Sequence, residues 1–308
     1  RDAQESRGLG DVYKRQTESC GITKINFINR IIKQEVFIML ADCHVHSEFS
    51  SDSETPVTDM LNRAVACGMK YFYLTDHHDI DFPVDAENGM DFQLDTPSYL
   101  TRIAELTDQY REQITVRTGV ELGLMAHIAD KLETYVSDYN FDFIIGSSHL
   151  VRGMDPYYPS YYEGRSQTEA YREYFESIYE NTKTFQNYDV YGHLDYVVRY
   201  GPTQNQGWNF RDYADVFEAI FKNLIHQGKG IEINTAGLYK GLGYPHPHRD
   251  ILSMYKDMGG EIITVGSDAH QPQYFAYGFD IAEDLLKDCG FRYYCVFKNR
   301  KPEFISLT

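Results

Sequence analysis

The sequence is short of cysteine and of long apolar runs. Only five of its 308 residues are cysteines, and their spacing contains neither a CxxC pair nor a disulfide framework. No apolar stretch reaches the roughly 20 residues that a membrane-spanning helix needs. These absences predict a reduced, soluble, cytoplasmic protein with no membrane partner.

Cationic side chains are also scarce, with 29 Lys and Arg against 46 Asp and Glu and a formal net charge of −17. Such a surface repels the phosphates of nucleic acids, so we expect no nucleic-acid partner. Any phosphate-bearing substrate has to be drawn by a local cationic site, such as metal ions together with an arginine. The charge therefore favours a small-molecule substrate over a polynucleotide and leaves the oligomeric state open.

The first 38 residues differ from the remainder of the chain. The sequence opens with Arg1, residues 1–16 are polar without periodicity, and the first methionine is Met39. We expect residues 1–38 to be a non-functional or disordered N-terminal extension and residues 39–308 to form the catalytic domain. A targeting peptide is the alternative, but acidic side chains are mixed with the basic ones and no cleavable apolar core follows.

Short β-branched or aromatic runs alternate with longer amphipathic stretches, as is typical of βα units. The expected strands are residues 36–44, 71–76, 115–121, 143–148, 190–193, 230–234 and 262–267, with a last strand at 293–297. The expected helices are residues 98–112, 167–183, 211–227 and 247–258. One more helix is expected after Thr55, as its N-cap, with Pro56 in the first helical position. A strand and a helix repeated in this way close most simply into one α/β barrel.

Metal-binding types of side chain stand at or just beyond the ends of nearly all these strands. They are His44, His46, Asp52, His77, Glu121, His149, His193, Asp268 and His270. In α/β barrels the carboxyl ends of the strands converge on one face. A single His there is usually an ordinary hydrogen-bonded residue, but this many His and carboxylate groups suit a polynuclear site for Zn, Mn or Fe.

The order of the motifs resembles the polymerase and histidinol phosphatase (PHP) superfamily, and within it the monofunctional histidinol-phosphatase family. The resemblance covers about residues 40–308. The motifs are His44-x-His46, Thr75-Asp76-His77, Gly119-x-Glu121, Ser148-His149, Gly192-His193-x-Asp195 and Ser267-Asp268-Ala269-His270. It implies a distorted (β/α)7 barrel, similar to a TIM barrel, with three divalent metal ions at the C-terminal ends of the strands.

The resemblance also implies which residues bind each ion. One ion would take His44, His46, Glu121 and Asp268. A second would share Glu121 and add His149 and His193, and the third would take Asp52, His77 and His270. Some relatives have His where this chain has Asp52, and a carboxylate there favours Mn or Fe(II) over Zn.

The function implied by the resemblance is hydrolysis of L-histidinol phosphate to L-histidinol and phosphate in histidine biosynthesis, by attack of a metal-activated hydroxide. One alternative is a PHP-family phosphoesterase that acts on nucleotides or on another small phosphate ester. A second alternative, of a different class, is a non-catalytic metal-binding module.

Three further side chains are candidates for catalysis. Arg199 and Arg165 can hold phosphate oxygens in a bidentate manner, although each can also be an ordinary surface or helix-start cation. Asp195 follows His193 by two residues and would face the same side of a strand. It is either a proton-transfer or supporting carboxylate, or the partner of Arg199.

Two long loops are expected to shape the substrate pocket. Residues 79–96 are rich in Asp and Glu, and residues 151–167 are rich in Tyr. Asp76 and His78 flank His77 and are candidate partners for a ligand imidazole. A second His-x-His motif, His246-Pro247-His248, is expected to be a loop and helix start.

Overall fold

The computed structural model of the protein describes residues 39–83 and 91–307. The predicted extension at residues 1–38, the start of the expected strand 36–44, and part of the acidic loop, including Asp85 and Glu87, lie outside the described residues. Within the described ranges, no helix has the length and apolar character needed to cross a membrane.

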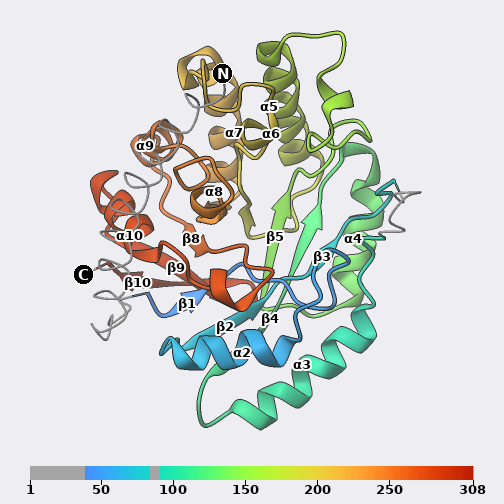
Figure 1. Ribbon diagram of the computed structural model, residues 1–308, viewed down its shortest axis with the longest axis vertical. Coiled ribbons are helices and arrows are strands. Elements are labelled where there is room, and N and C mark those ends of the chain that lie inside the picture. Colours follow the sequence, from blue (N-terminus) through green and yellow to red (C-terminus); the bar gives the residue numbers. More distant parts are fainter. Residues whose placement is uncertain (1–38, 84–90, 308) are drawn as a thin grey trace, which may run out of the picture. The chain divides into compact units, whose positions relative to one another are not determined.

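Seven parallel strands form a nearly closed barrel (Figure 1). In spatial order they are β1 (Ala41–Asp42), β2 (Tyr71–Leu74), β4 (Thr115–Gly123), β5 (Phe143–Ser147), β6 (Val190–Tyr191), β7 (Gly230–Asn234) and β8 (Ile263–Gly266). The short β3 (His77–His78) follows β2 and also pairs with β4. Backbone bonds between the first and last strands join the sheet ends, with Cys43 N donating to Val265 O and Asp268 N to His44 O. The expected (β/α)7 barrel is confirmed.

Helices follow the strands and surround the sheet (Figure 1). The α-helices are α2 (Val57–Ala66), α3 (Thr96–Tyr110), α4 (Ala129–Asp138), α5 (Gln167–Thr184), α6 (Val197–Tyr200), α7 (Ala214–His226), α8 (Ala236–Tyr239), α9 (Arg249–Asp257) and α10 (Phe279–Asp288). The 3-10 helices are η1 (Ala126–Ile128), η2 (Pro159–Tyr162), η3 (Phe210–Tyr213) and η4 (Pro272–Tyr274). In α5 a capping box between Ser166 and Glu169 fixes the first turn, because it satisfies otherwise free backbone N–H groups.

The alternation of side chains along β7 shows how the barrel carries polar groups inside. Ile231 and Ile233 belong to the buried apolar core. Glu232 and Asn234 lie on the other face of the strand, where both approach His44. The interior of the barrel is therefore partly polar, and its polar groups gather at the end where the metal-type side chains stand.

The N-terminus of α2 differs from the sequence expectation. Pro56 occupies the N-cap position and makes no capping side-chain hydrogen bond, and the N–H of Val57 donates to Glu48 Oε2. The hydroxyl of Thr55 instead donates to the carbonyl oxygen of His270 at 2.7 Å. Thr55, at the start of the helix, thus holds the backbone of His270, a candidate metal ligand.

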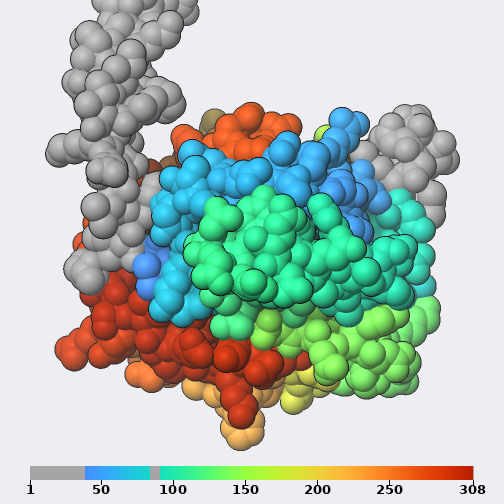
Figure 2. All heavy atoms as spheres, turned by 90° about the horizontal axis from the view of Figure 1, so that it is seen from below, coloured from blue at the N-terminus to red at the C-terminus, as the bar shows by residue number. Residues whose placement is uncertain are grey.

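The last predicted strand is present but does not belong to the barrel. β9 (Tyr293–Lys298) pairs antiparallel with β10 (Lys301–Ser306), which the sequence analysis missed. The connecting residues Asn299 and Arg300 both have positive φ, as a two-residue hairpin turn requires, although no glycine marks the turn. Figure 2 shows these C-terminal residues, in red, at the molecular surface.

Tyr73 fastens the hairpin to the barrel. Its buried hydroxyl donates to Phe297 O at 2.6 Å and accepts from Phe297 N at 2.9 Å.

Tyr73→Phe should lower the free energy of unfolding by about 1–3 kcal/mol, because two buried backbone groups lose their partner. Tyr293→Phe, at a position that is 47% exposed, is the matched control and should change it by less than about 0.5 kcal/mol. Urea denaturation measures both values, and equal midpoints would contradict this role of Tyr73.

Candidate metal centre

Glu121, at the end of β4, is surrounded by imidazole rings at the C-terminal face of the barrel. Its side chain is completely buried. Oε2 lies 3.1 Å from His44 Nε2, 3.0 Å from His77 Nδ1 and 3.5 Å from His46 Nε2. Oε1 lies 3.2 Å from His149 Nε2 and 2.9 Å from His193 Nε2. Five histidines from four strand ends thus meet at one carboxylate.

The remaining candidate ligands lie around this group. Asp268 Oδ1 is 3.4 Å from His46 Nε2. Asp52 Oδ2 is 3.1 Å from His270 Nε2 and 3.7 Å from His77 Nε2. The structure therefore brings together all nine residues that the sequence analysis selected as metal ligands.

The donor atoms of this cluster fit divalent metal ions. Several buried polar atoms have no hydrogen-bond partner in the described part of the chain: His44 Nε2, His46 Nε2, His77 Nδ1, Glu121 Oε2 and His270 Nε2. Buried polar atoms without partners are costly, and in native proteins they are rare. Ligand atoms of the cluster form overlapping groups of three, each within 4.8 Å, as in Glu121, His149 and His193. Imidazole nitrogen and carboxylate oxygen are suitable ligands for Zn, Mn and Fe.

The charges of the cluster keep Glu121 ionised but shift the pKa values of its histidines in both directions. Burial lowers the pKa of His44 and of His149, but Glu121 and Glu232 raise that of His44, and Asp79 and Glu121 raise that of His149, to well above the usual value. Burial alone would raise the pKa of Glu121, but the nearby His44, His149 and His77 hold it well below its usual value. Burial lowers the pKa of His46, and the neighbouring His270 and His77 lower it further. Burial also lowers the pKa of His193. An ionised carboxylate and neutral imidazoles are the forms that bind a metal ion.

Carboxylates outside the cluster orient two of its histidines. Glu232 Oε1 lies 2.7 Å from His44 Nδ1, and Asp79 Oδ2 lies 2.6 Å from His149 Nδ1. In both rings this contact leaves Nε2 directed at Glu121. Carboxylate–histidine contacts of this kind fix the tautomer and raise the basicity of ligand imidazoles in metal sites.

Sequence reasoning missed both partners, although a signal existed for each. Glu232 is the only charged residue in the strand Gly230–Asn234 and, like Glu121 in β4, is fully buried. Asp79 was included only as one of several acidic loop residues. Glu232 has a buried position within a strand, and Asp79 comes directly after β3. These positions distinguish the two residues from ordinary surface carboxylates.

The two flanking residues of His77 have different roles. Asp76 accepts from Ser50 Oγ at 2.7 Å, and Ser50 Oγ lies 3.1 Å from His46 Nδ1, so Asp76 supports His46 through a serine. His78 does not reach the cluster. Its Nδ1 accepts from Leu94 N at 3.1 Å, and its ring stacks on Tyr135.

The backbone around Asp268 is strained in a way that aims its side chain. Asp268 has a φ of 55°, which is uncommon for a residue with a Cβ atom. The hydroxyl of Tyr239 lies 2.9 Å from Asp268 O and 3.0 Å from Ser267 O, and donates to these carbonyls. Gly266 precedes this turn, where a Cβ would lie 2.3 Å from His44 Cβ. The end of β8 is thus shaped to place Asp268 beside His46.

Of the two candidate arginines, only Arg199 is available for a ligand. It is 5% exposed, its guanidinium lies over the rings of Tyr196 and Tyr200, and its Nε and Nη1 have no hydrogen-bond partner among the described residues. Arg165 pairs with Glu173, and its Nε donates to Tyr161 O at 2.6 Å. The guanidinium of Arg165 is therefore engaged in structural contacts.

Asp195 is not on a strand, contrary to the sequence expectation. β6 ends at Tyr191, and the chain then turns, with Tyr196 N donating to His193 O. Asp195 Oδ1 lies 2.6 Å from His246 Nδ1, and Oδ2 accepts from His248 N at 2.9 Å. It pairs with the second His-x-His segment rather than with Arg199. That segment is a loop and helix start as expected, since His248 is the N-cap of α9.

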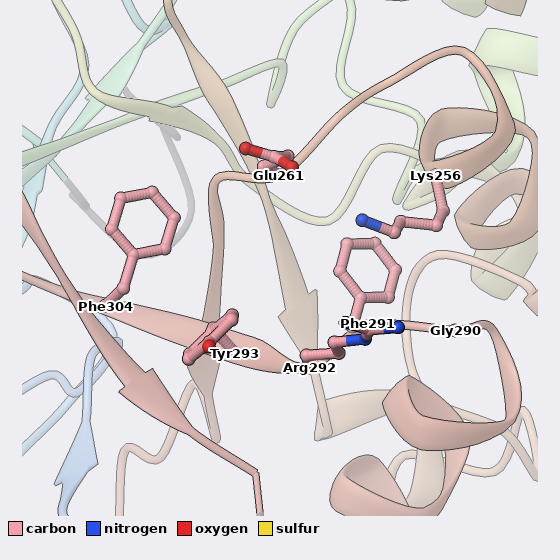
Figure 3. Close-up of a pocket in the computed structure, with 7 residues that line it drawn as sticks. All are labelled: Lys256, Glu261, Gly290, Phe291, Arg292, Tyr293 and Phe304. Carbon is pink, nitrogen blue, oxygen red and sulfur yellow. The ribbon is translucent and has the colours of Figure 1, made fainter.

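A pocket of about 310 Å³ opens beside the cluster. Both long loops contribute to its lining, which consists of Asp52, His77, Asp79, Phe82, Phe92, His149, Asp155, Tyr157, Tyr158, Tyr196 and Tyr200. A larger hollow of about 610 Å³ lies near β9 and β10 (Figure 3). Its lining includes one carboxylate, Glu261, and no histidine, so it is not a site for metal chemistry.

Comparison with known proteins assigns the family. The PHP domain profile matches residues 42–236, which is more than half of the chain. The chain belongs to the PHP family. The histidinol-phosphatase of Lactococcus lactis subsp. lactis (strain IL1403) is 31% identical over 261 residues, which cover 84% of this chain and 95% of that protein. A probable histidinol-phosphatase of Clostridium acetobutylicum is 26% identical, over 82% of this chain and 95% of that protein.

Solved structures agree with this assignment. The PHP fold here matches a crystal structure of histidinol phosphate phosphatase from Lactococcus lactis subsp. lactis Il1403 with a TM-score of 0.78, over 85% of this chain and 98% of that chain, at 31% identity. That structure is a complex with zinc, L-histidinol and phosphate. A putative histidinol phosphatase from Listeria monocytogenes, 17% identical, has the same fold with a TM-score of 0.68.

Glu232 offers a test of how the PHP site is organised. Glu232→Gln keeps the shape of the side chain but removes the charge beside His44 Nδ1, and should weaken metal binding by about 10- to 100-fold. Chelator competition measures this affinity. Glu283→Gln, at a buried glutamate paired with Lys287, is the matched control and should bind metal like the unaltered protein. Unchanged affinity in the Glu232 variant would contradict the orienting role.

Proposed function

We propose that this protein is a metal-dependent histidinol-phosphatase, which hydrolyses L-histidinol phosphate to L-histidinol and phosphate in histidine biosynthesis. The observation that carries the proposal is the gathering of nine candidate His, Asp and Glu ligands beside a 310 Å³ pocket. The likeness to the Lactococcus lactis enzyme, whose structure holds zinc, L-histidinol and phosphate, supports the choice of substrate. A biosynthetic role and the free cysteines of the described chain fit a cytoplasmic location.

We infer three divalent ions, Zn, Mn or Fe, with overlapping ligand sets. The first set is His44, His46, Glu121 and Asp268, the second is Glu121, His149 and His193, and the third is Asp52, His77 and His270. Divalent ions held there supply charge that polarises a phosphoryl group and lowers the pKa of a water molecule. The carboxylate of Asp52 in the third set favours Mn or Fe(II) over Zn at that position.

The protein's own residues bind and orient the ester. Nε and Nη1 of Arg199 have no hydrogen-bond partner among the described residues, so N–H donors of this buried guanidinium are available to phosphate oxygens. This guanidinium lies over the rings of Tyr196 and Tyr200, which position it. Because Arg199 is almost fully buried, its interaction with a phosphate is only weakly screened by water. Asp195, which contacts His246 and His248, is assigned to holding the loop after β7 rather than to the reaction.

Two other functions compete with this proposal. A phosphoesterase that acts on nucleotides would use the same metal ligands, but the uncharged organic part of a nucleotide offers no cation to the acidic lining of the pocket. A non-catalytic metal-binding module would not need the free donors of Arg199 at the edge of the cluster. The histidinol-phosphatase function accounts for both features.

Phosphate release from metal-stripped protein, reconstituted separately with Mn, Fe(II) or Zn, tests the function. The substrates are L-histidinol phosphate, nucleoside monophosphates and p-nitrophenyl phosphate. A strong preference for L-histidinol phosphate with at least one metal is the expected result. Preference for a nucleotide would show that the enzyme acts on another class of substrate. The absence of turnover despite bound metal would support the non-catalytic metal-binding module.

Arg199→Lys tests phosphate recognition. The variant keeps a positive charge but loses the planar guanidinium and its N–H donors, so KM for L-histidinol phosphate should rise about tenfold while metal content stays the same. Arg172→Lys, on the outside of α5 where Arg172 pairs with Asp215, is the matched control and should leave KM unchanged. Equal KM values for the Arg199 variant and the unaltered enzyme would remove Arg199 from the site.

A further inference from the structure

Asp155 is the pocket carboxylate that the metal cluster does not use. Three aspartates line the pocket, and two of them are engaged by histidines: Asp52 approaches His270, and Asp79 contacts His149. Asp155 accepts one hydrogen bond, from Tyr157 N to Oδ1 at 2.8 Å. Among the described residues, no Lys, Arg or His nitrogen lies within 4.0 Å of its carboxylate. It therefore forms no ion pair with a described residue, although His149 and Arg199 lie near enough to favour its ionised form.

Aromatic rings surround this position. Tyr157 lies 5.2 Å from Tyr200, measured between ring centroids, and Tyr200 lies 4.9 Å from Tyr196. Tyr157 and Tyr158 form a further edge contact at 5.1 Å. Aromatic faces attract cations and flat heterocycles. The end of the pocket that Asp155 occupies thus combines a carboxylate with tyrosine rings.

The surroundings of Asp155 also make an unpaired carboxylate unfavourable. It is half-buried, and burial raises its pKa to about 6. A ligand cation placed beside it would restore the stability of the ionised form, because opposite charges at short distance favour each other in a poorly solvated site. His149 and Arg199 favour the ionised form only in part, and neither forms an ion pair with Asp155 within 4.0 Å.

We propose that Asp155 is a specificity-determining residue that binds the positively charged amino or imidazole group of the substrate, while the phosphate lies at the metal cluster. This rests on the proposed phosphatase function and defines its substrate class as phosphate monoesters that carry a cation. Esters with a neutral organic group would keep the phosphate contacts but lose the contact with Asp155. The same contact disfavours nucleotides, whose organic part brings no cation at neutral pH.

Asp155→Asn in the full-length, metal-loaded protein tests the inference by calorimetric titration with L-histidinol, which has the cation but no phosphate. The Kd for L-histidinol should rise about tenfold or more, whereas the Kd for inorganic phosphate should stay within about twofold. Asp81→Asn is the matched control, since it removes the same charge from the other loop, at a residue paired with Lys131. It should bind L-histidinol like the unaltered protein.

Kinetics supply a second readout. KM for L-histidinol phosphate should rise in the Asp155→Asn variant, and kcat/KM for p-nitrophenyl phosphate should not change. Unchanged L-histidinol affinity, failure of the unaltered protein to bind L-histidinol, or an equal loss toward both esters would overturn the inference. Absence of L-histidinol phosphate turnover in the unaltered enzyme, with L-histidinol binding that still depends on Asp155, would overturn the proposed function alone.

Discussion

The structure depends on one buried carboxylate, Glu121, and the imidazole rings around it. Burial of a charge is costly unless cations or hydrogen-bond donors compensate it, and here several buried donor and acceptor atoms remain without partners. Bound divalent ions would satisfy these atoms together. Glu232 and Asp79, which lie outside the cluster, fix the orientation of two of its imidazole rings, since they leave Nε2 of His44 and His149 directed at Glu121.

The barrel makes this cluster possible because parallel strands deliver distant residues to one face. His44, Glu121 and Asp268 are far apart in the sequence yet lie within or just beyond strand ends on one face of the barrel. The same face carries the pocket, whose lining combines His77 and His149 with Asp155 and tyrosine rings. A substrate with an anionic and a cationic end matches this combination of groups.

Much of this could be predicted from the sequence because the signals were local. Short apolar runs that end in His or carboxylate residues gave the strands of the barrel and the nine candidate ligands. The partners of those residues could not be predicted in the same way, since they come from remote segments. Asp195 meets His246 across 51 positions, and Thr55 uses its hydroxyl on His270 instead of capping α2. The engagement of Arg165 with Glu173 could not be predicted for the same reason, because it depends on how η2 and α5 pack.

The most direct test of a Glu121-centred metal site is the metal content per chain of Glu121→Gln, measured by mass spectrometry after the same reconstitution as the unaltered protein. Because Glu121 belongs to two of the three ligand sets, the variant should lose about two of three ions. Retention of the full metal content would contradict the central role of this carboxylate.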